Sequence, residues 1–156
     1  MENQTTLIEV LNDLIEINHD RVVGYDKAIE QTQDVDIDLK AIFATMASNS
    51  KKYAAELAEE VNKLGGEPAE GTTNRGKVYR VWMDIKKAFA TNDRQAILTS
   101  CEFGESAAQS AYDEALASDA EISATLRILI LAQKDSLQTD QTIIKKYTDL
   151  HKAANA

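Results

Sequence analysis

Apolar residues recur at intervals of three and four along four long segments of this chain, at about 6–31, 38–64, 93–116 and 121–150. This spacing places them on one side of an α-helix, and no segment shows the alternation expected of a half-buried strand. The pattern predicts an all-α protein. The stripes include Leu7, Leu11, Leu14 and Val22 in the first segment, Leu39, Phe43, Met46 and Leu57 in the second, Ile97, Leu98 and Ala108 in the third, and Leu126, Leu137 and Ile144 in the fourth.

Two capping boxes and a glycine pair predict where helices begin and end. Thr6 with Glu9, and Ser118 with Glu121, have the spacing at which two side chains satisfy backbone donors of a first helical turn. The run LGGEP at 64–68 ends the second helix, because glycine accepts the left-handed conformation and proline prevents continuation. We expect the first and last helices to begin at the two boxes and the tail HKAANA to fray.

The helix lengths and connections predict a four-helix bundle, because helices of about 25 residues are roughly 38 Å long. Short connections make an antiparallel hairpin of the first two helices and another of the last two. Between the hairpins lie the loop GGEPAEGTTNRG and a short amphipathic helix, expected over 77–90, that carries Trp82. This crossover is long enough to return along the bundle, so it favours an up-down-down-up order, with up-down-up-down as the alternative. All 156 residues are expected to form a single domain, 1–156.

Each predicted helix interrupts its apolar stripe near its middle with a polar residue. Counting along the helices from their paired ends places all four interruptions at one depth. A buried amide or carboxylate costs several kcal/mol unless it is paired, so we expect these side chains to bind one another. The predicted layer consists of Asn18, Ser50, Glu105 and Gln133, and the hydroxyls that can join it from the same stripes are those of Tyr25, Tyr53, Tyr112 and Tyr147.

This polar layer has two interpretations. It could be a metal site, because Glu102, Glu105 and Asp140 offer the hard oxygen donors that suit iron or manganese. A di-metal site in a helical bundle needs several inward carboxylates and usually two histidines, and we place no carboxylate on the inner face of the first two helices. It could instead fix helix register, as one buried asparagine does in coiled coils. We favour the structural interpretation and expect no cofactor.

The charge and composition of the chain limit the classes of partner that it can bind. The net charge is -9, from 26 acidic and 17 basic residues, and the basic residues are scattered. Phosphate groups would be repelled, so we expect neither nucleic acid nor a membrane as partner. The start, MENQTTLIEV, lacks the pattern of a secretory signal, and the single Cys101 cannot form an intramolecular disulfide. We therefore expect a cytoplasmic protein.

Four segments together resemble the bacterial ferritin-like four-helix-bundle proteins of uncharacterised function, a stress-associated family: LNDLIEINHDRVVGYDKAI, LGGEP, RVWMDIKKAF and AILTSCEFGESAAQSAYDEAL. The resemblance extends from about Leu7 to Leu150 and implies a ferritin-like fold and a bacterial origin. Where relatives show Gly-Glu-Asp, this chain has Gly104, Glu105 and Ser106, and where they often carry His-Asp it has Thr139 and Asp140. The missing histidine argues further against a metal.

These observations predict a non-catalytic, stress-related binding or interaction module. We expect a homo-oligomer, specifically a dimer formed through a helix face or the Trp82 helix, or a complex with a protein partner. The alternative function is a di-metal carboxylate protein, binding iron or manganese, with oxidase or metal-handling activity.

Overall fold

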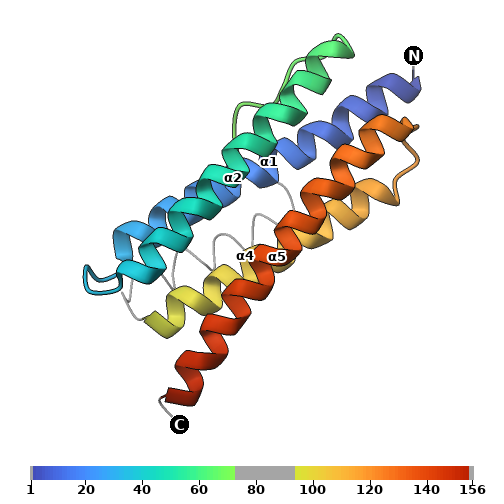
Figure 1. Ribbon diagram of the computed structural model, residues 1–156. Helices are drawn as coiled ribbons and strands as arrows, with labels where there is room; N and C mark the ends of the chain where they lie inside the picture. The colour runs from blue at the N-terminus through green and yellow to red at the C-terminus, as the bar shows by residue number, and fades with distance from the viewer. Residues whose placement is uncertain (1, 73–93, 155–156) are drawn as a thin grey trace.

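The computed structural model describes residues 2–72 and 94–154 of the chain. These residues form four long α-helices that pack as a bundle (Figure 1). The bounds of the helices are Glu2–Gln31 for α1, Ile37–Lys63 for α2, Arg94–Leu116 for α4 and Ala124–Ala154 for α5. The predicted all-α, four-helix architecture is confirmed. The short helix expected over 77–90, with Trp82, lies outside the described residues.

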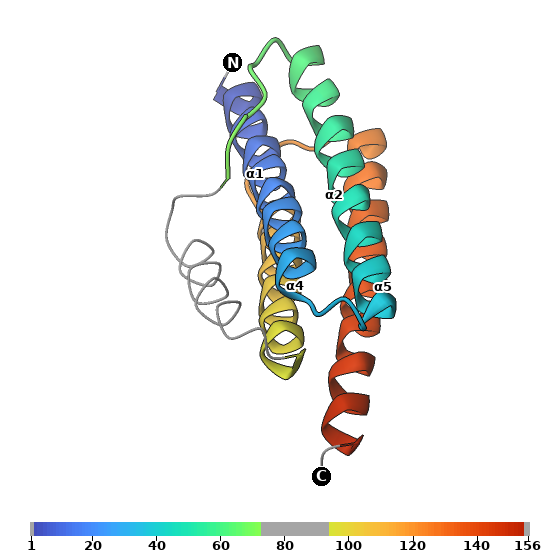
Figure 2. The same cartoon turned by 90° about the vertical axis from the view of Figure 1, so that its left-hand side faces the viewer.

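The helices form two antiparallel hairpins, α1 with α2 and α4 with α5. α2 and α4 run in the same direction, so the end of α2 and the start of α4 lie at opposite ends of the bundle (Figures 1 and 2). The order of directions along the chain is therefore up, down, down, up. The middles of all four helices lie at about one level along the bundle, and the polar residues that interrupt the apolar stripes lie at this level.

Two predicted helix starts are wrong. α1 already begins at Glu2, so Thr6 lies inside the helix. α5 begins at Ala124, where the hydroxyl of Ser123 accepts a hydrogen bond from the backbone N–H of Leu126 at 3.2 Å. Ser118 instead donates to the carbonyl of Ala115 at the end of α4, at 2.7 Å. The turn between them must cross the end of the bundle, and the helix starts only after Ala120 has packed into the core.

Two other helix ends can be compared with the sequence pattern. α2 ends as predicted, because Gly65 has a φ of +81°. The N–H of Gly66 donates to the carbonyl of Val61 at 3.0 Å and that of Gly65 to the carbonyl of Asn62 at 3.0 Å, which is a Schellman motif. At the other end of the chain, α5 continues through His151 to Ala154, and the last two residues of the tail expected to fray lie outside the described residues.

The apolar core is divided into two clusters along the bundle axis. The cluster at one end includes Leu11, Leu14, Leu57, Ala108, Tyr112 and Ile130. The cluster at the other end includes Leu39, Phe43, Met46, Ile97, Leu98 and Ile144. On α1, α2 and α4 the predicted layer residues lie between the first cluster and the second. On α5, Gln133 lies within the first cluster, between Ile130 and Leu137, and Asp140 lies between the two clusters.

A few large apolar side chains remain exposed on the outside of the bundle. Within residues 2–72 and 94–154, no helix has the length and apolar character needed to cross a membrane. The exposed large apolar residues in these ranges are Val23, Val35, Ile37, Phe103, Ile128, Leu131 and Leu150.

Candidate functional site

Arg21 of α1 lies at the centre of the polar layer and is completely buried. Its Nε and Nη2 atoms donate to Oε1 of Glu105 on α4, at 3.2 and 2.5 Å. Nη2 also donates to Oδ2 of Asp140 on α5 at 3.2 Å, and Nη1 donates to the hydroxyl of Ser50 on α2. One guanidinium therefore connects α1 to each of the other three described helices.

The helical period explains how α1 presents this arginine to the core. At about 100° per residue, Arg21 lies about 60° around the helix from Asn18 and about 40° from Tyr25. Asn18, Arg21 and Tyr25 therefore share one face, and all three are buried. Arg21 was not among the residues predicted for the layer, because an arginine directly after His19 and Asp20 looks like part of a solvated face. Its spacing of three from Asn18 and four from Tyr25 was the available signal.

The amide of Asn18 has a defined set of hydrogen-bond partners. Its nitrogen donates to the carbonyl of Leu14 at 2.8 Å and to the hydroxyl oxygen of Tyr112 at 2.9 Å. Its oxygen accepts a hydrogen bond from Ser50 at 3.0 Å. A leucine in the same place could neither donate nor accept, so the interruption of the apolar stripe by an amide follows from the needs of Ser50 and Tyr112.

Gln133 is joined to this network through Tyr112. The hydroxyl of Tyr112 donates to Oε1 of Gln133 at 2.7 Å. The amide nitrogen of Gln133 lies 3.2 Å from Oε1 of Glu56 and 3.4 Å from the carbonyl of Tyr53, both on α2. The structure thus places Asn18, Ser50, Glu105 and Gln133 in one connected layer, with Arg21 and Tyr112 as the links.

The four tyrosines do not share one role. Tyr25 donates to Oε1 of Glu105, and the guanidinium carbon of Arg21 lies 5.3 Å from the centre of its ring, which is cation–π distance. Tyr53 is hydrogen-bonded to Ser136 of α5 rather than to the central carboxylates. Tyr147 is half-buried and packs against the second core cluster. Tyr25 and Tyr112 are therefore the tyrosines that contact the four predicted layer residues through their hydroxyls.

The three residues considered as metal ligands do not converge. Glu105 and Asp140 both bind Arg21. Glu102 is half-buried and lines an open groove of about 440 Å³ between α4 and α5, together with Phe103 and Lys145. Among the residues that the structure describes, no group of three or more His, Cys, Asp or Glu side chains is arranged to hold a metal ion.

The charges in the layer depend on burial and on mutual attraction. Burial raises the pKa of Glu105, while Arg21 and the hydroxyl of Tyr25 oppose that rise. Burial also raises the pKa of Asp140. For Arg21, burial acts to lower the pKa, but the combined effects of Glu105, Tyr25 and Asp140 outweigh it, and the pKa lies above its usual value. Arg21 therefore remains a fixed positive charge beside two carboxyl groups.

Comparison with known proteins identifies a family but no activity. A search of curated proteins finds no match. Residues 6–118 match a family described as "Domain of unknown function (DUF2383)". The matched stretch includes most of α1, all of α2 and all of α4, and it ends before α5. Because the match covers well over half of the chain, this protein belongs to the DUF2383 family, a domain of unknown function.

Proposed function

We propose that this protein is a non-catalytic, ferritin-like bundle that acts through its surface as a stress-related binding or interaction module. Its sequence motifs, and their order along the chain, resemble those of stress-associated bacterial proteins, and this resemblance supports a stress-related function. The lone, buried thiol of Cys101 suits a reducing compartment, which supports a cytoplasmic location. In this proposal the polar layer holds the helices in register and has no chemistry of its own.

Arg21 lies between Glu105 and Asp140, and this position is the main support for a structural role of the polar layer. Its Nη2 atom lies 2.5 Å from Oε1 of Glu105 and 3.2 Å from Oδ2 of Asp140. These are the oxygens that a metal ion between α4 and α5 would need. The guanidinium already supplies the positive charge, and a divalent cation brought beside it would be repelled.

The carboxylate oxygens of the layer are poorly arranged for the alternative function, that of a di-metal carboxylate protein. Iron and manganese sites in helical bundles take several carboxylates from facing helices. Here the two central carboxyl groups are bound to Arg21, and Glu102 lines the groove between α4 and α5. The chemistry of these residues does not suit iron or manganese, so we derive no oxidase or metal-handling step from them.

Metal analysis of the purified protein tests this proposal. Protein prepared without chelator is analysed for iron and manganese, and each metal is then titrated into the wild type, Glu105→Gln and Glu102→Gln. We expect well below one equivalent of metal in all three, with no difference between them. One or two equivalents in the wild type, lost in Glu105→Gln but kept in Glu102→Gln, would show that the layer binds metal and overturn the proposal.

A further inference from the structure

The outer face of α5 collects exposed apolar residues. Of the seven large apolar residues that are exposed within the described ranges, Ile128, Leu131 and Leu150 lie on this one helix. At about 100° per residue, all three lie within about 60° of the direction of Ile128. We call this stripe the α5 outer face; its residues are Ile128, Leu131, Asp135, Thr139, Thr142, Lys146, Asp149 and Leu150.

The α5 outer face carries pairs of complementary residues whose midpoints lie close to Thr139. Ile128 and Leu150 are 22 residues apart, and the point midway between them is Thr139. Asp135 and Lys146, which carry opposite charges, also lie on either side of this point. The midpoint between Leu131 and Leu150, and that between Asp135 and Lys146, both fall between residues 140 and 141, within two residues of Thr139.

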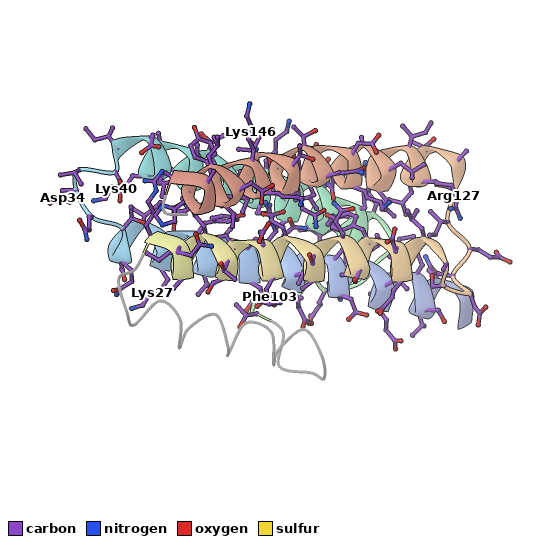
Figure 3. All side chains as sticks on the ribbon, turned by 90° about the horizontal axis from the view of Figure 1, so that it is seen from below. Lys27, Asp34, Lys40, Phe103, Arg127 and Lys146 are labelled. Atoms are coloured by element: carbon purple, nitrogen blue, oxygen red, sulfur yellow. The ribbon has the colours of Figure 1, made fainter. Side chains whose placement is uncertain are left out.

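Arg127 and Asp149 form a second pair of oppositely charged residues on α5. Arg127 lies near the start of α5 and Asp149 near its end, with a midpoint one residue from Thr139. Figure 3 shows Arg127 at one end of α5 and Lys146 farther along the helix, projecting away from the bundle. Arg127 and Asp149 thus carry opposite charges on the two halves of α5, as Asp135 and Lys146 do.

We propose that the α5 outer face binds a second copy of this chain, with the two α5 helices antiparallel and the two-fold axis near Thr139. A two-fold interface must be self-complementary, because residue i meets residue j and residue j meets residue i. In this arrangement Ile128 and Leu131 pack against Leu150 of the second copy. Asp135 faces Lys146 of the second copy, and Arg127 faces Asp149 of the second copy.

The length and exposure of α5 suit this pairing. A helix of 31 residues is about 46 Å long, and packed helices lie about 8–10 Å apart, so the two ends of the face can be covered at once. Asp149 already pairs with Lys145 of its own helix at 3.8 Å, with both side chains well exposed. Such exposed pairs contribute little, so Asp149 can exchange this contact for Arg127 of the second copy.

The inference does not depend on the role of the polar layer, because no residue of the α5 outer face contributes to the Arg21 network. Dimerisation can therefore fail while the buried network remains structural, and the converse also holds.

The first experiment is sedimentation equilibrium of the full chain, the Leu131→Glu variant and the Val35→Glu control. Val35 is an exposed apolar residue of the α1–α2 turn, far from the α5 outer face in the sequence.

We expect a concentration-dependent dimer of the wild type and of Val35→Glu, and a dissociation constant at least tenfold higher for Leu131→Glu. A wild type that stays monomeric at several hundred micromolar overturns the proposal. So does a dimer whose dissociation constant is the same in Leu131→Glu, because the copies would then associate through another surface.

Cysteine cross-linking tests the antiparallel arrangement itself. Thr139→Cys should form a disulfide-linked dimer on mild oxidation, because the two-fold axis brings the two copies of this position together. Ile128→Cys and Leu150→Cys should each fail to cross-link alone and should cross-link when mixed. The native Cys101 is buried and so does not compete. Cross-linking of Ile128→Cys with itself, or of none of the three, contradicts antiparallel pairing through this face.

Discussion

Nη2 of Arg21 lies 2.5 Å from Oε1 of Glu105, and both side chains are completely excluded from solvent. The two residues are 84 positions apart in the sequence, on α1 and α4. Breaking a buried pair of this kind leaves an uncompensated charge, which typically costs about 3–5 kcal/mol. The contact therefore ties the first hairpin to the second and disfavours any shift of one helix along the other.

Tyr25 strengthens this pair, and its hydroxyl can be removed alone. Tyr25→Phe should lower the free energy of unfolding by about 1–3 kcal/mol, because Oε1 of Glu105 loses a buried donor. Urea unfolding monitored by circular dichroism measures the change. Tyr147→Phe is the matched control, at a half-buried tyrosine of α5, and should change stability by about 0.5 kcal/mol or less. Equal effects of the two substitutions would contradict the assigned role of Tyr25.

Asn18→Leu tests whether the core needs its amide. The added apolar surface favours folding, but the Ser50 hydroxyl loses its acceptor and Tyr112 loses a donor inside the core. Since a buried unsatisfied polar group costs about 1–3 kcal/mol, the variant should be less stable than the wild type by roughly that amount. The free energy of unfolding in urea measures it. A more stable Asn18→Leu would show that the amide is dispensable to the fold.

Much of the fold and part of the layer follow from local pattern. The spacing of apolar residues predicts the four helices because a helix buries one face, and Asn18 and Glu105 stand out because they interrupt that face. Arg21 could not be found in the same way. Its spacing from Asn18 and Tyr25 places it on the buried face of α1, but a buried arginine needs partners, and these are Glu105 and Asp140 on α4 and α5, which the sequence of α1 does not reveal.

The wrong start of α5 has a similar physical cause. Ser118 and Ser123 can both serve as helix caps on local chemistry alone. In the structure Ala120, which lies between the two serines, packs into the core, and Ser123 provides the cap of α5. A capping pattern describes one turn, whereas the position of a turn across a bundle depends on the helices it connects.

Stability should fall in alkaline solution because of buried groups that keep their protons. Burial raises the pKa of the Cys101 thiol, with Glu105 adding to the effect, and burial raises the pKa of Tyr25 and of Tyr112. Below about pH 8.5 both the folded and unfolded chains hold these protons, so stability is constant with respect to them. As the pH rises above about 8.5, and then above about 10, the unfolded chain releases protons that the folded chain retains, and stability decreases.

Cys101→Ala isolates one of these protons. Each retained proton contributes a slope of about 1.4 kcal/mol per pH unit. The free energy of unfolding of the wild type should therefore fall more steeply between about pH 9 and 10 than that of Cys101→Ala, by up to this amount. Urea titrations at a series of pH values give both slopes. Identical slopes would mean that the thiol ionises as readily in the folded protein as in the unfolded chain.

We infer that Arg21 is the counter-ion of the buried carboxyl groups of Glu105 and Asp140. A double-mutant cycle of Arg21→Met and Glu105→Leu, measured as free energies of unfolding, gives the energy of the interaction between Arg21 and Glu105. Each single variant should lose about 3–5 kcal/mol, because one charge remains buried without its partner. The double variant should lose much less than the sum, with a coupling free energy of about 2 kcal/mol or more. Losses that simply add, with coupling below about 0.5 kcal/mol, would contradict the claim.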